Sequence, residues 1–378
     1  MAPQGLALED TRLATDQLAR DVQLATGGDV VVERVLGEGR MARVYEAEQQ
    51  SLGRRVAVKV LLPRRARDRR TLTRFRRESR SMAVCSHPGI VGVFSVGETS
   101  RGLPFFVMEY VDGETLERRL SRKGKLPLRE VSRVVSAVAD ALSYAHGRGL
   151  VHRDVKPANV LLERGTGRVL LTDFGLAKAV KGVARITTLT GTGEIMGTPE
   201  YLSPEQAEKG EVDARSDQYS LAVMTYEMLA GRLPFPGPEP QDFLRQHVDD
   251  TPTWLPRIEP SVPLAVSKAV DRGLMKEPGA RFGSAEAFGQ ALKGAAEAAT
   301  AAEPRRKLWW GYERQLVQAT AIYAGAAWGV LEALTWVLET FDLPMEFRQP
   351  ALLLVVGGLP LTLGLLCYAR NRPQAAEA

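Results

Sequence analysis

The first part of the chain contains short runs rich in apolar residues, a pattern that predicts β-strands. Residues 30–36 form one such run, and residues 37–45 add a glycine-containing loop and a returning strand. Alternation along residues 55–61 places Ala57 and Lys59 on the same face of a further strand. The apolar run 104–108 predicts another strand.

Helical spacing of apolar residues replaces this alternation at residues 72–82 and again from Glu114 onward. Two later stretches, 315–331 and 349–369, carry no charged residue. Each is roughly 20 residues long, a length that lets a helix cross a bilayer. Buried helices that pack on the rest of the protein are the alternative for this pair.

The chain has 378 residues, which predicts a two-lobed unit plus an appendage rather than one ordinary core. Its net charge of only +5 argues against a nucleic-acid binder that is positive all over. Nine arginines lie between residues 64 and 80. They are expected to form either a solvated helix face or a basic surface that contacts anionic lipid headgroups or a phosphate on a regulatory loop. The two cysteines, Cys85 and Cys367, indicate no disulfide framework, and residues 1–20 lack the apolar core of a secretory signal.

A polar motif at residues 151–159, Val-His-Arg-Asp-Val-Lys-Pro-Ala-Asn, is followed by Asp-Phe-Gly at 173–175. Phosphoryl transfer asks little covalent work of a protein, so catalysis depends on alignment and on neutralising crowded negative charge. Asp154 fits a base that orients an acceptor hydroxyl, while Asn159 and Asp173 fit magnesium ligands. A lone His-Arg-Asp tripeptide usually marks a solvated turn, but the full set is far more specific.

These motifs resemble those of the eukaryotic-like Ser/Thr protein kinases of bacteria, from about residue 30 to about residue 296. The resemblance implies an α+β, bilobal protein-kinase fold, with a small antiparallel β-sheet lobe plus a helix and a larger, mainly α lobe. It also implies transfer of the γ-phosphoryl group of ATP to Ser or Thr hydroxyls of proteins, in signalling. The implied cofactors are ATP and Mg²⁺, with Mn²⁺ as an alternative ion. Lys156, two residues after Asp154, resembles Ser/Thr kinases more than Tyr kinases.

The resemblance assigns roles residue by residue. The implied catalytic residues are Asp154, Lys156, Lys59, Glu78 and Thr198. The implied nucleotide-binding residues are Gly37, Glu38, Gly39, Val44, Ala57, Lys59, Met108, Glu109, Val111, Asn159, Leu161 and Asp173, with Asn159 and Asp173 also holding the metal. Ala42 stands where the family usually has a third glycine. The predicted hairpin of residues 30–45 would form a lid over the phosphates, and we expect the alanine to stiffen this lid and to weaken nucleotide binding.

Several of these residues also have a plainer interpretation. Gly37 and Gly39 alone would fit an ordinary hairpin turn, and an isolated Lys59 would fit a solvated edge strand. Glu78 resembles the glutamate that clamps Lys59, but a surface ion pair with a neighbouring arginine of its own helix is the alternative. Thr198 resembles the threonine that positions Asp154, and a turn residue before proline is its alternative.

The glycine- and threonine-containing segment after Asp173 predicts a regulatory loop. Its candidate phosphorylation sites are Thr187, Thr188, Thr190 and Thr192, and a phosphate on one of them could pair with Arg153. An unmodified loop is the alternative. By resemblance, Glu205 and Arg281 form a distant scaffold pair, and Asp217 braces the catalytic loop.

The predicted organisation places a membrane anchor after the catalytic domain. Its segments are an N-terminal extension (1–28), the kinase catalytic domain (29–296), a juxtamembrane linker (297–313), a first transmembrane helix (314–338), a short outer loop (339–348), a second transmembrane helix (349–369) and a cytosolic tail (370–378). Arginines and lysines flank the outer ends of the two helices, whereas the loop between them is mainly acidic. The protein is therefore expected in the cytoplasmic membrane, with the catalytic domain and both termini in the cytosol.

The expected partners are protein substrates, the lipid bilayer and a second copy of this chain, but no nucleic acid. Gly325 and Gly329 form a small-xxx-small surface that suits either dimerisation or packing of the two helices against each other. A membrane-bound pseudokinase scaffold is the main rival function, and a small-molecule phosphotransferase of the same fold is the second. Because every residue expected to do chemistry is present, an active protein kinase is the favoured interpretation.

Overall fold

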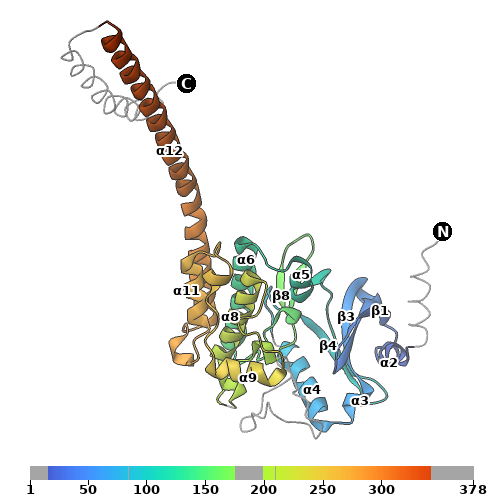
Figure 1. The fold of residues 1–378 in the computed structure, drawn as a ribbon. Coiled ribbons are helices and arrows are strands. Elements are labelled where there is room, and N and C mark those ends of the chain that lie inside the picture. The colour runs from blue at the N-terminus through green and yellow to red at the C-terminus, as the bar shows by residue number, and fades with distance from the viewer. Residues whose placement is uncertain (1–15, 84, 175–198, 209, 342–378) are drawn as a thin grey trace. The chain divides into compact units, whose positions relative to one another are not determined.

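The computed structural model describes residues 16–83, 85–174, 199–208 and 210–341. The chain forms two compact units, Met1–Ala299 and Thr300–Ala378. The first unit has a sheet-rich small lobe and a helical large lobe, so the expected bilobal α+β fold is confirmed (Figure 1).

The small lobe is built on an antiparallel sheet whose strand order is β1-β2-β3-β5-β4. Its elements are α2 (Gln17–Ala25), β1 (Val30–Glu38), β2 (Ala42–Gln49), the 3₁₀ turn η1 (Gln50–Leu52), β3 (Arg54–Leu61), α3 (Pro63–Ala66), α4 (Arg69–Ala83), β4 (Val93–Glu98) and β5 (Pro104–Glu109). The four strands expected from the apolar pattern are present, and β1 and β2 form the predicted hairpin.

Both faces of this sheet are covered, which explains why β3 and β5 are buried at nearly every position. Val58 and Phe105 belong to a cluster with Val22 of α2, whereas Ala57 and Phe106 belong to a cluster with Phe75 of α4. Sequence reasoning assigned no element to the extension that contains α2. The two-sided burial of β3 was the available signal that a second covering element was needed.

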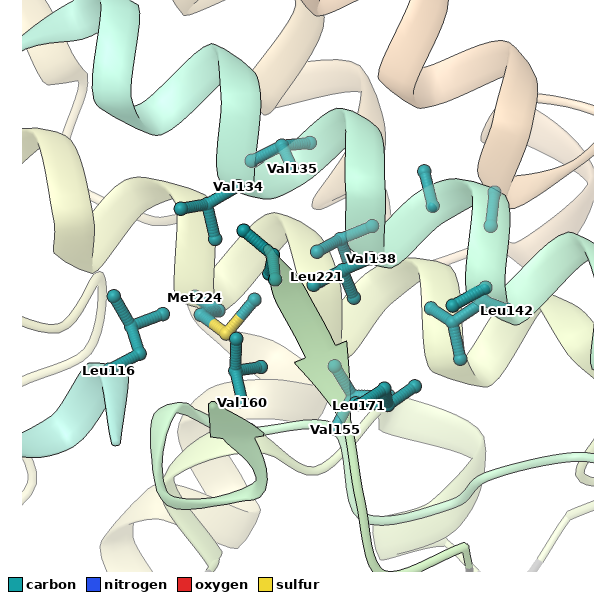
Figure 2. Close-up of a cluster of buried hydrophobic side chains, with 14 of the residues drawn as sticks. Leu116, Val134, Val135, Val138, Leu142, Val155, Val160, Leu171, Leu221 and Met224 are labelled. Atoms are coloured by element: carbon teal, nitrogen blue, oxygen red, sulfur yellow. The ribbon is translucent and has the colours of Figure 1, made fainter. Parts of the chain in front are cut away.

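The large lobe surrounds two long helices, α6 (Leu128–His146) and α8 (Ala214–Ala230). Its other elements are β6 (Gly113–Thr115), α5 (Leu116–Lys123), η2 (Pro157–Asn159), β7 (Val160–Glu163), β8 (Val169–Leu171), η3 (Pro199–Tyr201), α7 (Pro204–Ala207), α9 (Pro240–Asp249), α10 (Leu255–Ile258), α11 (Leu264–Gly273) and η4 (Pro278–Ala280). In Figure 2, Val134 and Val138 of α6 point toward Leu221 of α8. This hydrophobic core supports the loops that bear the polar motifs, since Val155 of the first motif and Val160, the residue directly after that motif, enter it (Figure 2).

The helix expected from Glu114 begins two residues later. Residues 113–115 form strand β6, which pairs with β7, and the Oγ1 of Thr115 caps α5 by accepting a hydrogen bond from the Arg118 N–H at 3.1 Å. A Cβ at Gly113 would lie 2.0 Å from the Leu162 carbonyl oxygen. The close approach of the two strands therefore requires glycine at this position, and the strand precedes the helix.

The C-terminal helix α12 (Ala285–Thr340) is continuous through the expected juxtamembrane linker, 297–313. Among the described residues, no helix combines enough length with enough apolar character to span a bilayer. This finding does not support the first expected pass at 314–338, where Gln318, Thr320 and Glu332 dilute the apolar run. The second expected pass, 349–369, lies outside the described residues.

His247 of α9 is a fully buried, titratable group in the large lobe. Its Nε2 lies 3.0 Å from the Glu200 carbonyl oxygen, which can only accept, so Nε2 carries a proton. The hydroxyl of Tyr219 lies 3.0 Å from Nδ1 and donates to it. Burial lowers the pKa of His247 to about 4, against a partial opposing effect of the Glu200 hydrogen bond.

Acid should therefore destabilise the fold through His247. Between about pH 6.5 and 4 the unfolded chain binds a proton that the native protein does not, so stability rises with pH and is lost as pH falls through this window. We expect the titration of this residue to lower the free energy of unfolding by about 2 kcal/mol between pH 7 and pH 5. Urea denaturation of the wild type and of His247→Gln measures it, because glutamine cannot titrate. If the free energy of unfolding depended on pH with the same slope in the two proteins, the assignment to His247 would be wrong.

Candidate active site

Lys59 and Asp173 connect the small lobe to the polar motifs of the large lobe. Lys59 lies on β3, and its Nζ is 2.7 Å from Oδ1 of Asp173. The Lys59 side chain is 7% exposed and that of Asp173 is 31% exposed. Burial opposes ionisation of Asp173, but the charge and hydrogen bond of Lys59 outweigh this and hold the pKa of the carboxyl below its usual range. The Asp173 carboxyl is therefore ionised at neutral pH.

The residues expected to surround an adenine come from both lobes and belong to, or pack against, one hydrophobic cluster. Ala57 pairs with Met108 across β3 and β5, and both side chains are buried. Val44, Val111 and Leu161 pack against the same cluster. The N–H of Glu109 donates to the Gly92 carbonyl at 2.8 Å, and its carboxylate accepts from Arg168 at 3.0 Å. Apolar side chains thus dominate this part of the site, as a planar base requires.

The hairpin expected to cover the phosphates turns between β1 and β2. A Cβ at Gly37 would meet nothing within 4 Å, and one at Gly39 would meet only the Ala42 carbonyl oxygen at 3.8 Å. Neither glycine has a positive φ. Packing within the protein therefore does not require these glycines, and the space beside them is compatible with close approach of a ligand. Ala42 is buried at the start of β2, and its expected effect on nucleotide affinity stays a prediction.

The catalytic loop is held by Asp217 of α8, whose side chain is 1% exposed. Its Oδ2 accepts from the His152 N–H at 2.7 Å and its Oδ1 accepts from the Arg153 N–H at 2.6 Å. Oδ2 also lies 2.7 Å from Nε2 of His146. Arg153 has a positive φ of 67°, an unfavourable conformation for a residue with a Cβ. The buried carboxylate stabilises that backbone, which is the brace that the motif predicts.

Asp154, Lys156 and Asn159 converge at the end of this loop. Nζ of Lys156 lies 2.9 Å from Oδ2 of Asp154. Nδ2 of Asn159 donates to the carbonyl of Asp154 at 2.8 Å and to its Oδ2 at 3.0 Å. Both side chains thus bind the same carboxylate oxygen of Asp154, and the Asp154 side chain remains 35% exposed, accessible to an incoming hydroxyl.

The Asp154 group lies beside the second polar motif. The Thr172 N–H donates to the Asn159 carbonyl at 2.9 Å, and Nε2 of His152 lies 3.0 Å from the Thr172 carbonyl. The ring of Phe174 is buried and packs on His152 with centroids 4.7 Å apart. Asp173 itself has a positive φ of 61°. These contacts fix Asp173 next to Asn159, as a shared cation would require.

The chemistry of these donors fits magnesium. Because Nδ2 of Asn159 faces Asp154, its Oδ1 points away from Asp154, and Oδ2 of Asp173 is not the oxygen that Lys59 binds. Both are hard oxygen donors, and Mg²⁺ in phosphotransfer sites usually takes one or two side-chain ligands plus phosphate oxygens and water. In the described part of the chain, no three His, Cys, Asp or Glu side chains form a metal cluster.

Several predicted site residues cannot be placed. Thr187, Thr188, Thr190, Thr192 and Thr198 lie outside the described residues. Glu78 falls on α4, but its side chain is outside the described set, so its clamp on Lys59 stays a prediction.

Two supporting residues were missed by the sequence reasoning. Gln206 donates to the Arg153 carbonyl at 3.1 Å, and His146 contacts Asp217. The Ser203-x-x-Gln206 spacing matches a capping box, which the structure contains, and that signal could have located the start of α7. Nothing in the pattern indicates that the same glutamine reaches the catalytic loop.

Glu205 and Arg281 form the expected scaffold pair below the loop. Nη1 and Nη2 of Arg281 lie 3.0 and 2.9 Å from the two carboxylate oxygens, and the Arg281 side chain is fully buried. Burial opposes ionisation of Glu205, but the hydrogen bond and charge of Arg281 lower its pKa overall. Arg281 also donates to the carbonyls of Met275, Arg215 and Lys276.

Comparison with known proteins agrees with this geometry. The family model described as the protein kinase domain matches residues 30–291, so the chain belongs to that family. A probable serine/threonine-protein kinase of Streptomyces coelicolor is 43% identical over 263 residues, which cover 69% of this chain and 39% of that protein. Serine/threonine-protein kinase PrkC of Bacillus subtilis is 36% identical, over 72% of this chain and 41% of its own length.

A crystal structure of the PknI kinase domain of Mycobacterium tuberculosis matches with a TM-score of 0.55 and 33% identity, over 71% of this chain and 96% of that one. Serine/threonine-protein kinase PknA of the same species is 39% identical, over 72% of this chain and 62% of that protein. The chain thus spans less than two thirds of the length of these curated relatives.

Loss of Arg281 should be costly because it leaves a buried carboxylate without its cation. We expect Arg281→Met to lower the free energy of unfolding by about 3 to 5 kcal/mol. The matched control is Arg245→Met, which breaks a surface pair with Asp250 at 2.9 Å and should cost less than about 1 kcal/mol. Urea denaturation measures both, and similar losses for the two variants would refute the role given to Arg281.

Proposed function

We propose that this protein is an ATP-dependent protein kinase that phosphorylates Ser or Thr hydroxyls of proteins. The observation that carries the proposal is the arrangement of Lys59 with Asp173 beside the group of Asp154, Lys156 and Asn159. Phosphoryl transfer needs positioning and charge neutralisation, and this arrangement supplies both. The names of the relatives support a Ser/Thr acceptor.

Each residue has a defined task in this proposal. Lys59 pairs with the α- and β-phosphates of ATP, and the apolar residues around Ala57 bind the base. Asp154 orients the acceptor hydroxyl and takes its proton, while Lys156 neutralises charge on the group in transfer. Asn159 and Asp173 would hold Mg²⁺, which when bound neutralises phosphate charge. The exposed face of Asp154 gives the acceptor access.

A pseudokinase scaffold is the rival, and the site argues against it. A scaffold that only binds nucleotide has no need of a base, yet Asp154 is held by Lys156 and Asn159 at hydrogen-bonding distance. The substitution of Ala42 for a glycine is the one departure near the phosphates, and it bears on affinity rather than on the base. The two functions differ in turnover, which a direct assay measures.

Phosphotransfer should therefore depend on the carboxylate of Asp154. We expect Asp154→Asn to lower the turnover number about 10²- to 10⁴-fold, because general-base contributions have that size. ATP binding should persist, since Asp154 is not among the residues expected to bind the nucleotide. The full chain is incubated with labelled ATP, Mg²⁺ and a generic protein substrate. Asp213→Asn, on the surface, is the control. A wild type that binds ATP but transfers no phosphate would establish the pseudokinase instead.

We also propose that the segment after Asp173 is a target of the kinase itself. Its threonines are Thr187, Thr188, Thr190 and Thr192, and a phosphate there could pair with Arg153. Support comes from the position of Arg153 directly before Asp154, where a new charge would act on the catalytic loop. Phosphopeptide mapping of the wild type and of Asp154→Asn, made in the same assay, identifies sites that depend on the enzyme's own activity.

The C-terminal region is proposed as a membrane anchor in the cytoplasmic membrane, with the kinase domain and both termini in the cytosol. Support comes from the uncharged stretches 315–331 and 349–369 and from the basic residues at their outer ends. On α12, large apolar side chains such as Ile322, Trp328 and Trp336 are 74%, 70% and 65% exposed in the isolated chain, as lipid-facing groups would be. A Cβ at Gly325 or Gly329 would meet open space, which suits close approach by a second helix and a possible homodimer.

An anchored protein should stay with the membrane pellet after alkaline extraction. Leu353→Arg together with Val356→Arg should release a large fraction of it, because each central arginine costs about 2.5 to 3.5 kcal/mol of insertion energy. Ala376→Arg, in the polar tail, is the control and should remain in the pellet. Extraction of the wild type into the supernatant at high pH would disprove the anchor.

A further inference from the structure

Helix α2 precedes residue 30, where the match to the family model begins, and therefore lies outside the matched residues. It starts at a capping residue, Asp16, whose Oδ1 accepts from the Leu18 N–H at 3.0 Å. Leu18, Ala19 and Val22 form one buried face at helical spacing. Figure 1 shows the helix lying against the small-lobe sheet beside β1.

Two acidic residues fasten the helix at different places. Asp21 is 3% exposed, lies 3.2 Å from Nη1 of Arg101 and accepts from Gln17 at 2.8 Å. Arg101 belongs to the turn between β4 and β5, on the side of the sheet away from the β1–β2 hairpin. Asp16 instead contacts the hairpin itself. The helix is thus fixed both to the far edge of the sheet and to the proposed lid.

The two oxygens of Asp16 have separate tasks. Oδ1 caps α2, whereas Oδ2 accepts from Nη1 of Arg43 at 2.8 Å and from the Tyr45 hydroxyl at 2.8 Å. Nε of Arg43 continues to Oε2 of Glu38 at 2.7 Å. Glu38 and Arg43 face each other as the last paired residues of the hairpin. An unbroken polar chain therefore runs from the helix to both strands of the lid.

This polar chain is shielded enough from water to constrain the hairpin. The side chain of Asp16 is 11% exposed and that of Arg43 is 26% exposed. Charge-assisted hydrogen bonds are about twice as strong as neutral ones, and partial burial reduces their screening by salt. Beyond Glu38 and Arg43 the tip is held by the pairing of Ala42 with Leu61 of β3, by a turn bond from Gly39 to Ala42, and by bonds from Leu62 and Arg65 to carbonyls of Met41 and Arg40.

We propose that α2 is a positioning element for the nucleotide lid and that Asp16 is the residue that transmits its position, through Arg43, to the hairpin over the phosphates. The inference rests on the proposed function, because ATP is the ligand that the lid would cover. Asp16 does not touch ATP. It acts by restricting the conformations of the hairpin, so its loss should weaken nucleotide binding rather than the chemical step.

The test compares matched substitutions in the full chain. Asp16→Asn keeps an oxygen that can cap α2 but places an NH₂ group, a donor, opposite the donors of Arg43. Asp21→Asn is the same change in the same helix and loosens the attachment to Arg101 instead. Leu24→Ala removes an exposed side chain of α2 and controls for surface changes.

Three measurements are made. Displacement of a fluorescent nucleotide gives the Kd for ATP with Mg²⁺, steady-state kinetics give kcat and KM, and hydrogen exchange with mass spectrometry reports on residues 37–43. For Asp16→Asn we expect a Kd and a KM for ATP raised about three- to tenfold, kcat within about twofold of wild type, and faster exchange in the hairpin. Asp21→Asn and Leu24→Ala should change these values less than about twofold.

The outcomes separate the two proposals. Wild-type Kd and unchanged hairpin exchange in Asp16→Asn would overturn the inference, as would an equal effect of Asp21→Asn, which would indicate general loosening of the helix. A wild type that neither binds ATP nor transfers phosphate would defeat the proposed function. In that case faster hairpin exchange confined to Asp16→Asn would still support the mechanical link, and its absence would refute it.

Discussion

The bonds of Asp217 to the catalytic loop are the constraint on which the rest of the site depends. A carboxylate removed from water is unfavourable unless its oxygens are satisfied, and here backbone N–H groups of His152 and Arg153 satisfy them. The same bonds offset a positive φ at Arg153, which costs about 1 to 3 kcal/mol. Asp154 is the next residue in the chain after Arg153. The position of Asp154, the proposed base, is thus set by a buried residue 63 positions further along the chain, on a helix that itself belongs to the core.

Further contacts hold α8 and the loop of residues 152–154 in position relative to each other. Glu205 and Arg281 pair beneath the loop, and Arg281 adds bonds to three backbone carbonyls around them. Gln206, next in sequence to Glu205, reaches the Arg153 carbonyl. Both backbone sides of Arg153 are therefore occupied, the N–H by Asp217 and the carbonyl by Gln206. Precise placement of a catalytic group depends on such a shell more than on the group's own side chain.

Much of this could be predicted because the chemistry constrains residue types and spacing. Strand alternation placed Ala57 and Lys59 on one face, and the structure puts both in the interior beside Met108 and Asp173. The polar motifs predicted that Asp154 and Asn159 would work together, and they lie within hydrogen-bonding distance. The spacing of residues within a motif could not predict contacts between elements that are distant in the sequence, such as that of Gln206 with Arg153. The start of α5 was misplaced because the close strand pairing at Gly113 is a tertiary effect.

The helix α2 was missed for a different reason, namely that the motifs describe only the face of the sheet that carries Lys59, although the apolar residues on both faces of β3 were a signal for a second covering element. The strand β3 is buried along both faces, and one face must remain open at Lys59 for a ligand. An element that restrained the hairpin from the face that carries Ala57 and Lys59 would compete with the proposed nucleotide for space. A restraint that leaves this face free has to come from the opposite face of the sheet. Asp16 meets this condition, because it reaches the hairpin from α2, whose buried residues pack with Val58 and Phe105 on the face opposite Ala57.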